Sequence, residues 1–208
     1  MDAIVGSFGA ALHAAILKTR PPRGTARPDT EALYKALEST ETVVSARFGG
    51  HVFHRYRGRA SNKKPSYAKK SKKALEYLWD FSFSRFAIPQ VIEQKGATPI
   101  HGGKYELLVV AESELGSPDE VCRDLLKLLD ARCRVRCLIY RRPKRSPACD
   151  ALHQRMVRIM HNHAHFTPRR EVWLLVGLEW GPSRLGCCVH TLNSRGTGFR
   201  LVKAEATA

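Results

Sequence analysis

The sequence predicts an α/β (α+β) fold in which helices flank a mixed central sheet. Five apolar segments of strand length lie between residues 76 and 192, and two segments of helix length separate them. A chain of 208 residues with 43% hydrophobic residues is also large enough to bury one substantial core. The resulting order is helix, strand, strand, helix, strand, helix, strand, strand, which is typical of a sheet covered by helices.

Residues 1–20 are predicted to form an amphipathic or buried helix rather than a targeting or membrane segment. Asp2 stands where a secretory signal carries basic residues, and His13 interrupts the apolar run. The segment is also too short to cross a bilayer. A linker rich in proline and arginine follows. We therefore expect residues 1–28 to be a helix and linker, and residues 29–208 to be a single domain of a cytoplasmic protein without a membrane partner.

The next segments are a short helix and a basic arm. Residues 30–41 are predicted to form a helix capped by Asp29 or Thr30. Residues 47–73 contain no acid and are broken by Gly, Ser, Asn and Pro, which indicates a loop or arm rather than a helix. Its cations can neutralise phosphates, so the arm is a predicted nucleic-acid contact; the alternative is a solvated linker. The residues assigned to that contact are Arg55, Arg57, Arg59, Lys63, Lys64, Lys69, Lys70, Lys72 and Lys73.

The charge of the whole chain favours the same kind of partner. It has 35 Lys and Arg against 19 Asp and Glu, which gives a net charge of +16. Such a charge favours nucleic acid or another anionic surface and disfavours basic partners. The alternative is a basic protein with no polyanionic partner.

Two strands and a well-marked helix form the middle of the chain. Residues 76–86 are aromatic with a period of two, and residues 104–113 are the next predicted strand. Ser117 is a suitable N-cap and Pro118 suits the first helical position, so a helix is expected over 119–132 with one broad apolar face.

The remaining predicted elements complete the sheet. They are a strand over 134–142, a helix over 146–163 and strands over 171–180 and 184–192, followed by a frayed tail. Six scattered cysteines without a CxxC pair indicate reduced thiols rather than disulfides or a zinc site. His161 and His165 share one face of the helix, and a frayed helix end is preferred there over a metal site.

Three carboxylates mark a candidate site. Alternate side chains of a strand share a face, so Glu112 and Glu114 lie on the same side, and Asp80 joins them if the two strands are neighbours. Carboxylates that converge raise one another's pKa. A bound Mg²⁺ relieves that repulsion, because it takes one or two carboxylates, water and phosphate oxygens as ligands. The alternative is a strand that simply ends in solvent.

The stretches EYLWDFSFSRF, ELLVVAESELG and DEVCRDLLKLLDARCRVRCLIYRR, which span Glu76 to Arg142, resemble the core of the PD-(D/E)xK nuclease superfamily in order and spacing. This restriction-endonuclease-like fold has a strand with Asp, a strand carrying (D/E)xK, a helix and a further strand. The resemblance implies that Asp80 is the first metal-binding carboxylate and Glu112 the second.

The sequence departs from that family pattern at two positions. Trp79 replaces the usual proline, and Glu114 stands where lysine is usual. Glu114 is then expected to help with metal or water, as in family members with Glu-x-Glu, or Lys127 of the following helix supplies the lysine. The alternative for Lys127, which its place on the polar side of the helix favours, is simple exposure to solvent. Glu76 is a candidate auxiliary acid, and Asp124 is expected to be a charge on the helix surface.

The resulting hypothesis is a nuclease that hydrolyses phosphodiester bonds with Mg²⁺ or Mn²⁺, favouring DNA over RNA, with Asp80, Glu112, Glu114 and Lys127 as its catalytic residues. Many enzymes of this fold dimerise, so a homodimer or a larger complex is a plausible assembly. The alternative is a non-catalytic basic nucleic-acid-binding protein, such as a subunit of a nucleoprotein complex.

Overall fold

The fold is described from a computed structural model of the chain. It describes residues 2–18, 30–48, 52–55, 80–84, 107–143, 146–168, 172–180 and 185–205. The helices are α1 (Asp2–Leu17), α2 (Thr30–Glu38), α3 (Glu41–Phe48), α5 (Pro118–Asp130) and α6 (Ser146–His161). The strands are β1 (Val52–Arg55), β2 (Phe81–Ser84), β3 (Leu107–Glu114), β4 (Cys133–Arg141), β5 (Val172–Trp180), β6 (Leu185–Leu192) and β7 (Phe199–Glu205).

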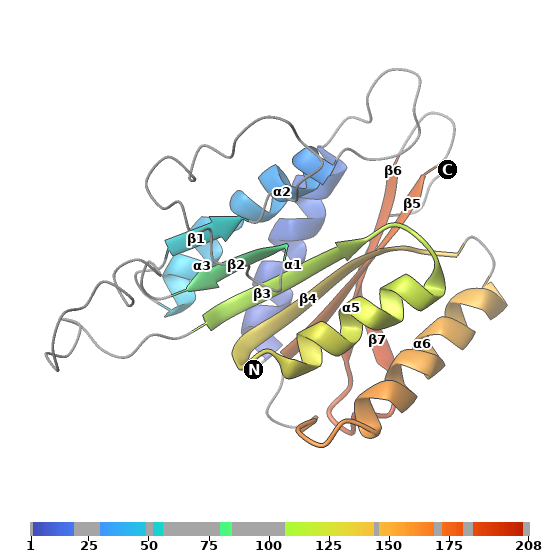
Figure 1. Cartoon of the computed structure of the whole chain (residues 1–208). Helices are drawn as coiled ribbons and strands as arrows, with labels where there is room; N and C mark the ends of the chain where they lie inside the picture. Colours follow the sequence, from blue (N-terminus) through green and yellow to red (C-terminus); the bar gives the residue numbers. More distant parts are fainter. Residues whose placement is uncertain are drawn as a thin grey trace, which may run out of the picture.

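The strands form one seven-stranded sheet in which spatial order follows chain order, from β1 to β7 (Figure 1). The centre is parallel, since β3 pairs with β4 and β4 with β5 in the same direction. Both flanks are antiparallel: β1 with β2 and β2 with β3 on one side, β5 with β6 and β6 with β7 on the other. The prediction of an α/β fold with a mixed sheet is therefore confirmed.

Helices cover both faces of the sheet. Helices α5 and α6 are the crossovers from β3 to β4 and from β4 to β5, and they pack together on one face. Two crossovers of the same hand that advance in the same direction place their helices on the same side. Helices α1, α2 and α3 belong to the core on the opposite face. The central strands are consequently buried on both sides, as their apolar sequences require.

Alternation along β3 divides its side chains between the two cores. Val109 and Ala111 are buried on the side of α1 to α3, whereas Val110 is buried on the side of α5 and α6. Glu112 has the same parity as Val110, so it lies on the α5 face. This alternation decides what surrounds the candidate carboxylates.

Helix α1 is part of the central core. Phe8, Leu12 and Ile16 are fully buried, and the helix packs on β6. His13 is also buried and places its Nε2 3.2 Å from the carbonyl oxygen of Cys187. The N-terminal helix, which the sequence analysis separated from residues 29–208, thus packs on the same sheet as the rest of the described chain.

Helix α5 begins and ends as its sequence dictates. Ser117 and Glu120 form a capping box, and Pro118 occupies the first turn. At the other end, Arg136 donates from Nε to the Leu128 carbonyl at 2.8 Å and from Nη2 to the Ala131 carbonyl at 2.6 Å. These bonds satisfy carbonyls that a helix end leaves without partners, and they tie α5 to β4.

Three elements differ from the sequence analysis. The helix expected over 30–41 ends at Glu38, where Thr40 donates its hydroxyl to the Leu37 carbonyl at 2.6 Å, and α3 follows. Strand β1 lies within the stretch predicted as a loop or arm, and β7 replaces the predicted frayed tail. Both strands are outermost in the sheet, and their pairing with a neighbour stabilises extended backbone that has little local apolar signal.

Among the described helices, none is long and apolar enough to cross a membrane.

Candidate active site

Asp80 immediately precedes β2 and is held against β3. Phe81 pairs with Ala111, so the next step of the register brings Asp80 opposite Glu112. The Oδ2 atom of Asp80 accepts a hydrogen bond from the backbone N–H of Ser113 and another from its hydroxyl, both at 2.9 Å. Burial raises the pKa of Asp80, although the Ser113 bonds act in the opposite direction. Asp80 is therefore a partly desolvated carboxylate in a fixed orientation.

Glu112 is the most deeply buried acid of the site. It is 2% exposed, and within the described part of the chain its Oε1 atom has no hydrogen-bond partner. Burial and, to a smaller extent, the nearby charges of Asp80 and Asp124 raise the pKa of Glu112 to about 9, although Lys127 acts in the opposite direction. The raised pKa favours the protonated, neutral form of this carboxyl group, whereas a bound cation would favour the carboxylate.

Lys127 and Asp124 reach the site from α5. The Nζ atom of Lys127 lies 2.6 Å from Asp124 Oδ1 and 3.9 Å from Glu112 Oε1. Burial lowers the pKa of Lys127, but its bond to Asp124 and the charges of the carboxylates together raise it above its ordinary value. The lysine is thus a protonated ammonium group beside the unpartnered oxygen.

Asp124 corrects one expectation from the sequence. It was expected to be a charge on the helix surface, but it is 8% exposed and holds the Lys127 ammonium group. Its position within the apolar face of α5 was the available signal, because it lies three residues after Val121 and four before Leu128, both of which are buried.

Tyr34 interacts with the Asp80 carboxylate from the other side of the sheet. Burial raises the pKa of this α2 phenol, the charge of Asp80 raises it further, and side-chain hydrogen bonds link the phenol to Ser113 and Asp80. The sequence analysis missed Tyr34, because nothing in the local pattern of α2 indicates a partner on β2 or β3. Asp80 therefore has polar neighbours from both β3 and α2.

Glu114 does not complete a group of three carboxylates. Its Oε1 atom accepts a hydrogen bond from the backbone N–H of Gly116 at 2.6 Å. Within the described residues, no three His, Cys, Asp or Glu side chains are arranged to hold a metal ion. The expected convergence of Asp80, Glu112 and Glu114 was wrong in this respect, because the turn after β3 offers Glu114 a backbone donor of its own.

The site nevertheless fits a hard cation with two protein carboxylates. Mg²⁺ commonly takes one or two carboxylates and completes its shell with water and substrate oxygens. The buried, unpartnered Oε1 of Glu112 and the neighbouring Asp80 carboxylate are oxygen donors of that kind. A cation there would stabilise the ionised form of Glu112, which burial disfavours relative to the protonated form.

Most of the predicted basic arm lies outside the described residues. Arg55 is the last residue of β1. The other assigned cations of the arm, from Arg57 to Lys73, and the candidate auxiliary acid Glu76 are outside the described ranges.

The competing sequence motifs have ordinary structural partners. His161 Nε2 lies 2.9 Å from the Gly196 carbonyl oxygen, and His163 Nε2 lies 3.1 Å from Asp130 Oδ1. All six cysteines are free thiols, as predicted, and five of them are buried.

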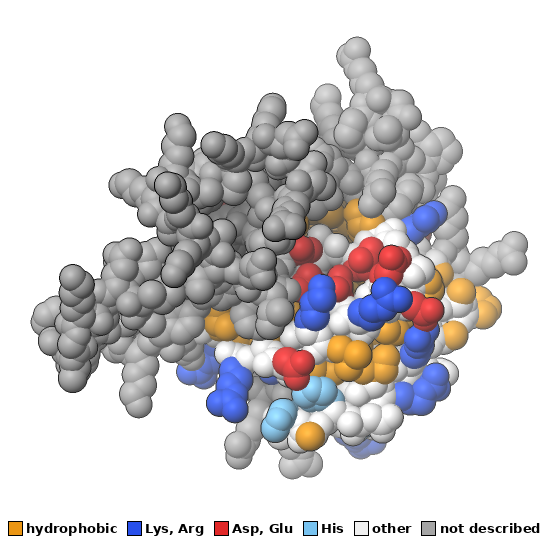
Figure 2. Space-filling model, viewed as in Figure 1, with side chains coloured by type: hydrophobic (Ala, Val, Ile, Leu, Met, Phe, Trp, Pro, Cys, Tyr) orange, Lys and Arg blue, Asp and Glu red, His pale blue; other side chains and the backbone are white. Residues whose placement is uncertain are grey.

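The space-filling view places the site in its surroundings. Acidic side chains lie next to Lys and Arg side chains on the described part of the face that carries α5, with a hydrophobic and histidine-containing surface beside them (Figure 2). The positive charge of the chain therefore does not exclude acidic groups from this face, where they are interspersed with cations. Comparisons of the chain with protein-family models, with curated proteins and with solved structures find no match.

Proposed function

We propose that the protein hydrolyses phosphodiester bonds of DNA with the help of Mg²⁺ or Mn²⁺ held by Asp80 and Glu112. The observation that carries the proposal is the buried Glu112 carboxyl group, with its unpartnered Oε1, beside Asp80 and within 3.9 Å of the Lys127 ammonium group. Desolvating two acids beside a lysine lowers the stability of the fold. Groups with pKa values perturbed in this way are common at sites of acid–base and metal chemistry.

The division of roles follows from the positions of the side chains. A bound divalent ion would supply Lewis acidity toward a phosphoryl oxygen and lower the pKa of a coordinated water. Ser113 keeps Asp80 in one orientation through two hydrogen bonds, and this pre-organises the Asp80 carboxylate for coordination. Glu112 supplies a second oxygen from the neighbouring strand.

Lys127 takes the place that the family pattern assigns to a lysine on the strand. Its ammonium group is near Glu112 and is held by Asp124, so it can stabilise negative charge that develops on a reacting phosphate. This arrangement agrees with the resemblance to PD-(D/E)xK nucleases whose lysine comes from the following helix. Glu114, bonded to Gly116, is then a residue of the turn rather than a ligand.

The substrate class follows from charge. A net charge of +16 supplies the sequence-independent attraction that polyanions require, and the basic residues from Arg55 to Lys73 add to it. We place the activity on cytoplasmic DNA rather than RNA, following the resemblance stated above.

A non-catalytic nucleic-acid-binding protein is the second candidate. The observation in its favour is that burial keeps Glu112 protonated without any ion, so the site is electrically tolerable when it is empty of metal. A protein of this kind would bind DNA equally well with and without divalent cations.

Cleavage of plasmid DNA decides between the two candidates. Purified protein is expected to nick or cut the plasmid with Mg²⁺ or Mn²⁺ and to be inactive in excess EDTA. Asp80→Asn and Glu112→Gln should each lower the cleavage rate by at least about a hundredfold while leaving the Kd for DNA within about twofold. Glu114→Gln is the matched control, since it removes a carboxylate two residues from Glu112 that bonds only within its own turn as described.

Persistent DNA binding without cleavage of DNA or RNA under either metal would exclude the enzyme and favour the second candidate. If Glu114→Gln lost as much activity as Asp80→Asn and Glu112→Gln, Glu114 would instead be a catalytic residue.

A further inference from the structure

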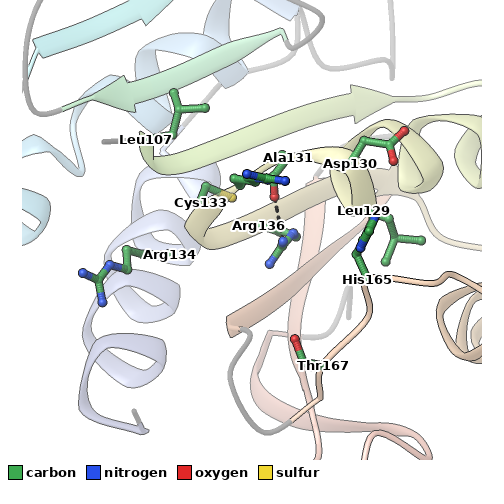
Figure 3. Close-up of a pocket in the computed structure, with 10 residues that line it drawn as sticks. Leu107, Leu129, Asp130, Ala131, Cys133, Arg134, Arg136, His165 and Thr167 are labelled. Carbon is green, nitrogen blue, oxygen red and sulfur yellow. Dashed lines mark hydrogen bonds between the residues drawn. The ribbon is translucent and has the colours of Figure 1, made fainter. Parts of the chain in front are cut away.

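A second polar hollow lies beside the C-terminal end of α5. It is a cavity of about 430 Å³ at the start of β3 and β4, and it reaches the segment that follows α6 (Figure 3). This volume is within the usual range for a ligand site. Nothing in the proposed cleavage chemistry uses it.

The cavity carries an excess of positive charge. Arg132, which immediately precedes β4, lines it together with Arg134 and Arg136, which occupy alternate positions on β4 and so lie on one side of the strand. Asp130 is the acid among the lining residues, and its carboxylate lies 3.1 Å from His163 Nε2. Among the described lining residues there are therefore three guanidinium groups and one carboxylate, which already has a partner.

The three arginines have different roles. Arg136 is 6% exposed, donates to the carbonyls that end α5, and lies 5.3 Å from the centre of the Trp173 ring. It forms the floor and holds the helix in place. Arg132 and Arg134 are exposed, and exposed His165 adds an imidazole at the rim. Guanidinium groups in a concave site are suited to bind phosphate oxygens.

The cavity and the carboxylate site lie along the same strand under the same helix. Leu107 lines the cavity, and Glu112 follows five positions later on β3. At about 3.3 Å per residue, the two positions are roughly 17 Å apart. A duplex that lies along β3 covers that distance in about half a helical turn.

We propose that this cavity binds a backbone phosphate of the DNA duplex whose scissile phosphodiester lies at Asp80 and Glu112. The inference rests on the proposed function for the identity of the scissile site. The contact fixes the register of the duplex on the α5 face, so it contributes to substrate binding rather than to the chemical step.

Binding measured in EDTA tests the contact separately from cleavage. In fluorescence anisotropy with a labelled duplex, the double variant Arg132→Gln/Arg134→Gln is expected to raise Kd on the order of tenfold and to reduce the slope of log Kd against log salt by about 2. Arg136 is left intact, because its loss would disturb the end of α5. Thermal melting checks that the double variant is folded.

Lys18→Gln/Lys35→Gln is the matched control. It also removes two exposed positive charges, but from α1 and α2 on the opposite face of the sheet. Its Kd and salt slope should change much less than those of the arginine variant. An equal loss in both variants would show a general effect of net charge and overturn the proposal.

Two further outcomes separate this inference from the proposed function. If the wild-type protein cleaves DNA and the arginine variant binds and cleaves as the wild type does, the cavity proposal fails and the nuclease stands. If the wild type never cleaves but only the arginine variant loses affinity, the phosphate contact stands and the nuclease fails. Inorganic phosphate that binds in the cavity at matched ionic strength, without competing with DNA, would show a small-anion site and overturn the proposal.

Discussion

Glu112 combines three properties that rarely coexist in a side chain without a ligand. It is buried, one of its oxygens has no hydrogen-bond partner, and its pKa is raised to about 9 by burial and by the charges of Asp80 and Asp124. Lys127 offsets only part of this cost from 3.9 Å. Burying the ionised form of Glu112 is therefore unfavourable, and either protonation or a bound cation removes that cost.

The raised pKa of Glu112 predicts how the stability of the fold depends on pH. Glu112 has an ordinary pKa of 4.5 when unfolded and about 9 when folded, so the stabilising contribution of its protonated form is complete below pH 4.5. Between these values the unfolded state loses a proton that the folded state keeps, so the free energy of unfolding falls as pH rises, by at most about 1.4 kcal/mol per pH unit. Glu112→Gln should flatten this slope and gain stability at pH 8, as measured by urea denaturation across pH 5 to 9.

Mg²⁺ provides the check on that prediction. An ion bound by the folded state adds stability through ligand linkage, so millimolar Mg²⁺ should raise the wild-type Tm at pH 8 and leave Glu112→Gln unchanged. A pH slope that is the same in both proteins would mean that Glu112 is not the titrating group.

Helix α5 is the element that connects the two polar regions of this face. Its N-terminus is set by the capping box of Ser117 and Glu120, its middle carries Asp124 and Lys127, and its end is held by Arg136. Buried Leu125 and Leu128 fix its rotation on the sheet. The position of the Lys127 ammonium group therefore depends on where this helix begins and which face it buries.

Loss of the cap should weaken the helix measurably. Ser117→Ala removes the side-chain acceptor for the Glu120 N–H, which typically costs about 1 kcal/mol. For a chain of this size that corresponds to a Tm lowered by about 2–4 °C, which differential scanning calorimetry can resolve. Ser117→Asp keeps an acceptor at the same position and should remain near the wild-type Tm; equal melting of all three proteins would contradict the role of the cap.

At the scale of the whole molecule, one sheet joins two cores. Helix α1 and its neighbours bury one face, and α5 and α6 bury the other, so the central strands belong to both. The N-terminal helix contributes Phe8, Leu12 and Ile16 to this arrangement. The sheet should therefore transmit a loss of packing on either face to the entire fold.

Leu12→Ala tests that coupling. Removing a fully buried leucine side chain typically costs about 2–5 kcal/mol. We expect the loss to appear in a single urea transition that coincides when followed by far-UV circular dichroism and by tryptophan fluorescence. Leu125→Ala on the opposite face is the matched control and should behave alike. A separate early transition in Leu12→Ala alone would show that α1 folds independently of the sheet.

Sequence and tertiary structure contributed different parts of this description. Local signals were sufficient for the alternating apolar strands and for the start of α5 at Ser117 and Pro118, because caps and periodicity act over a few residues. They also marked Asp80 and Glu112 as residues that would meet if their strands were neighbours, and it is the sheet pairing of β2 with β3 that makes them so. Strands β1 and β7 escaped prediction, since short outer strands depend on a neighbour for their pairing.

The composition of the site was decided only by long-range packing. The rotation of α5 buries Asp124 and brings Lys127 to Glu112, the turn after β3 directs Glu114 to Gly116, and α2 delivers Tyr34 to Asp80. None of these partners is close in sequence to all of the others. The sequence by itself therefore determined which residues carry charge at the end of β3, whereas tertiary structure decided which of them share one desolvated site, because burial and distance are properties of the packed fold.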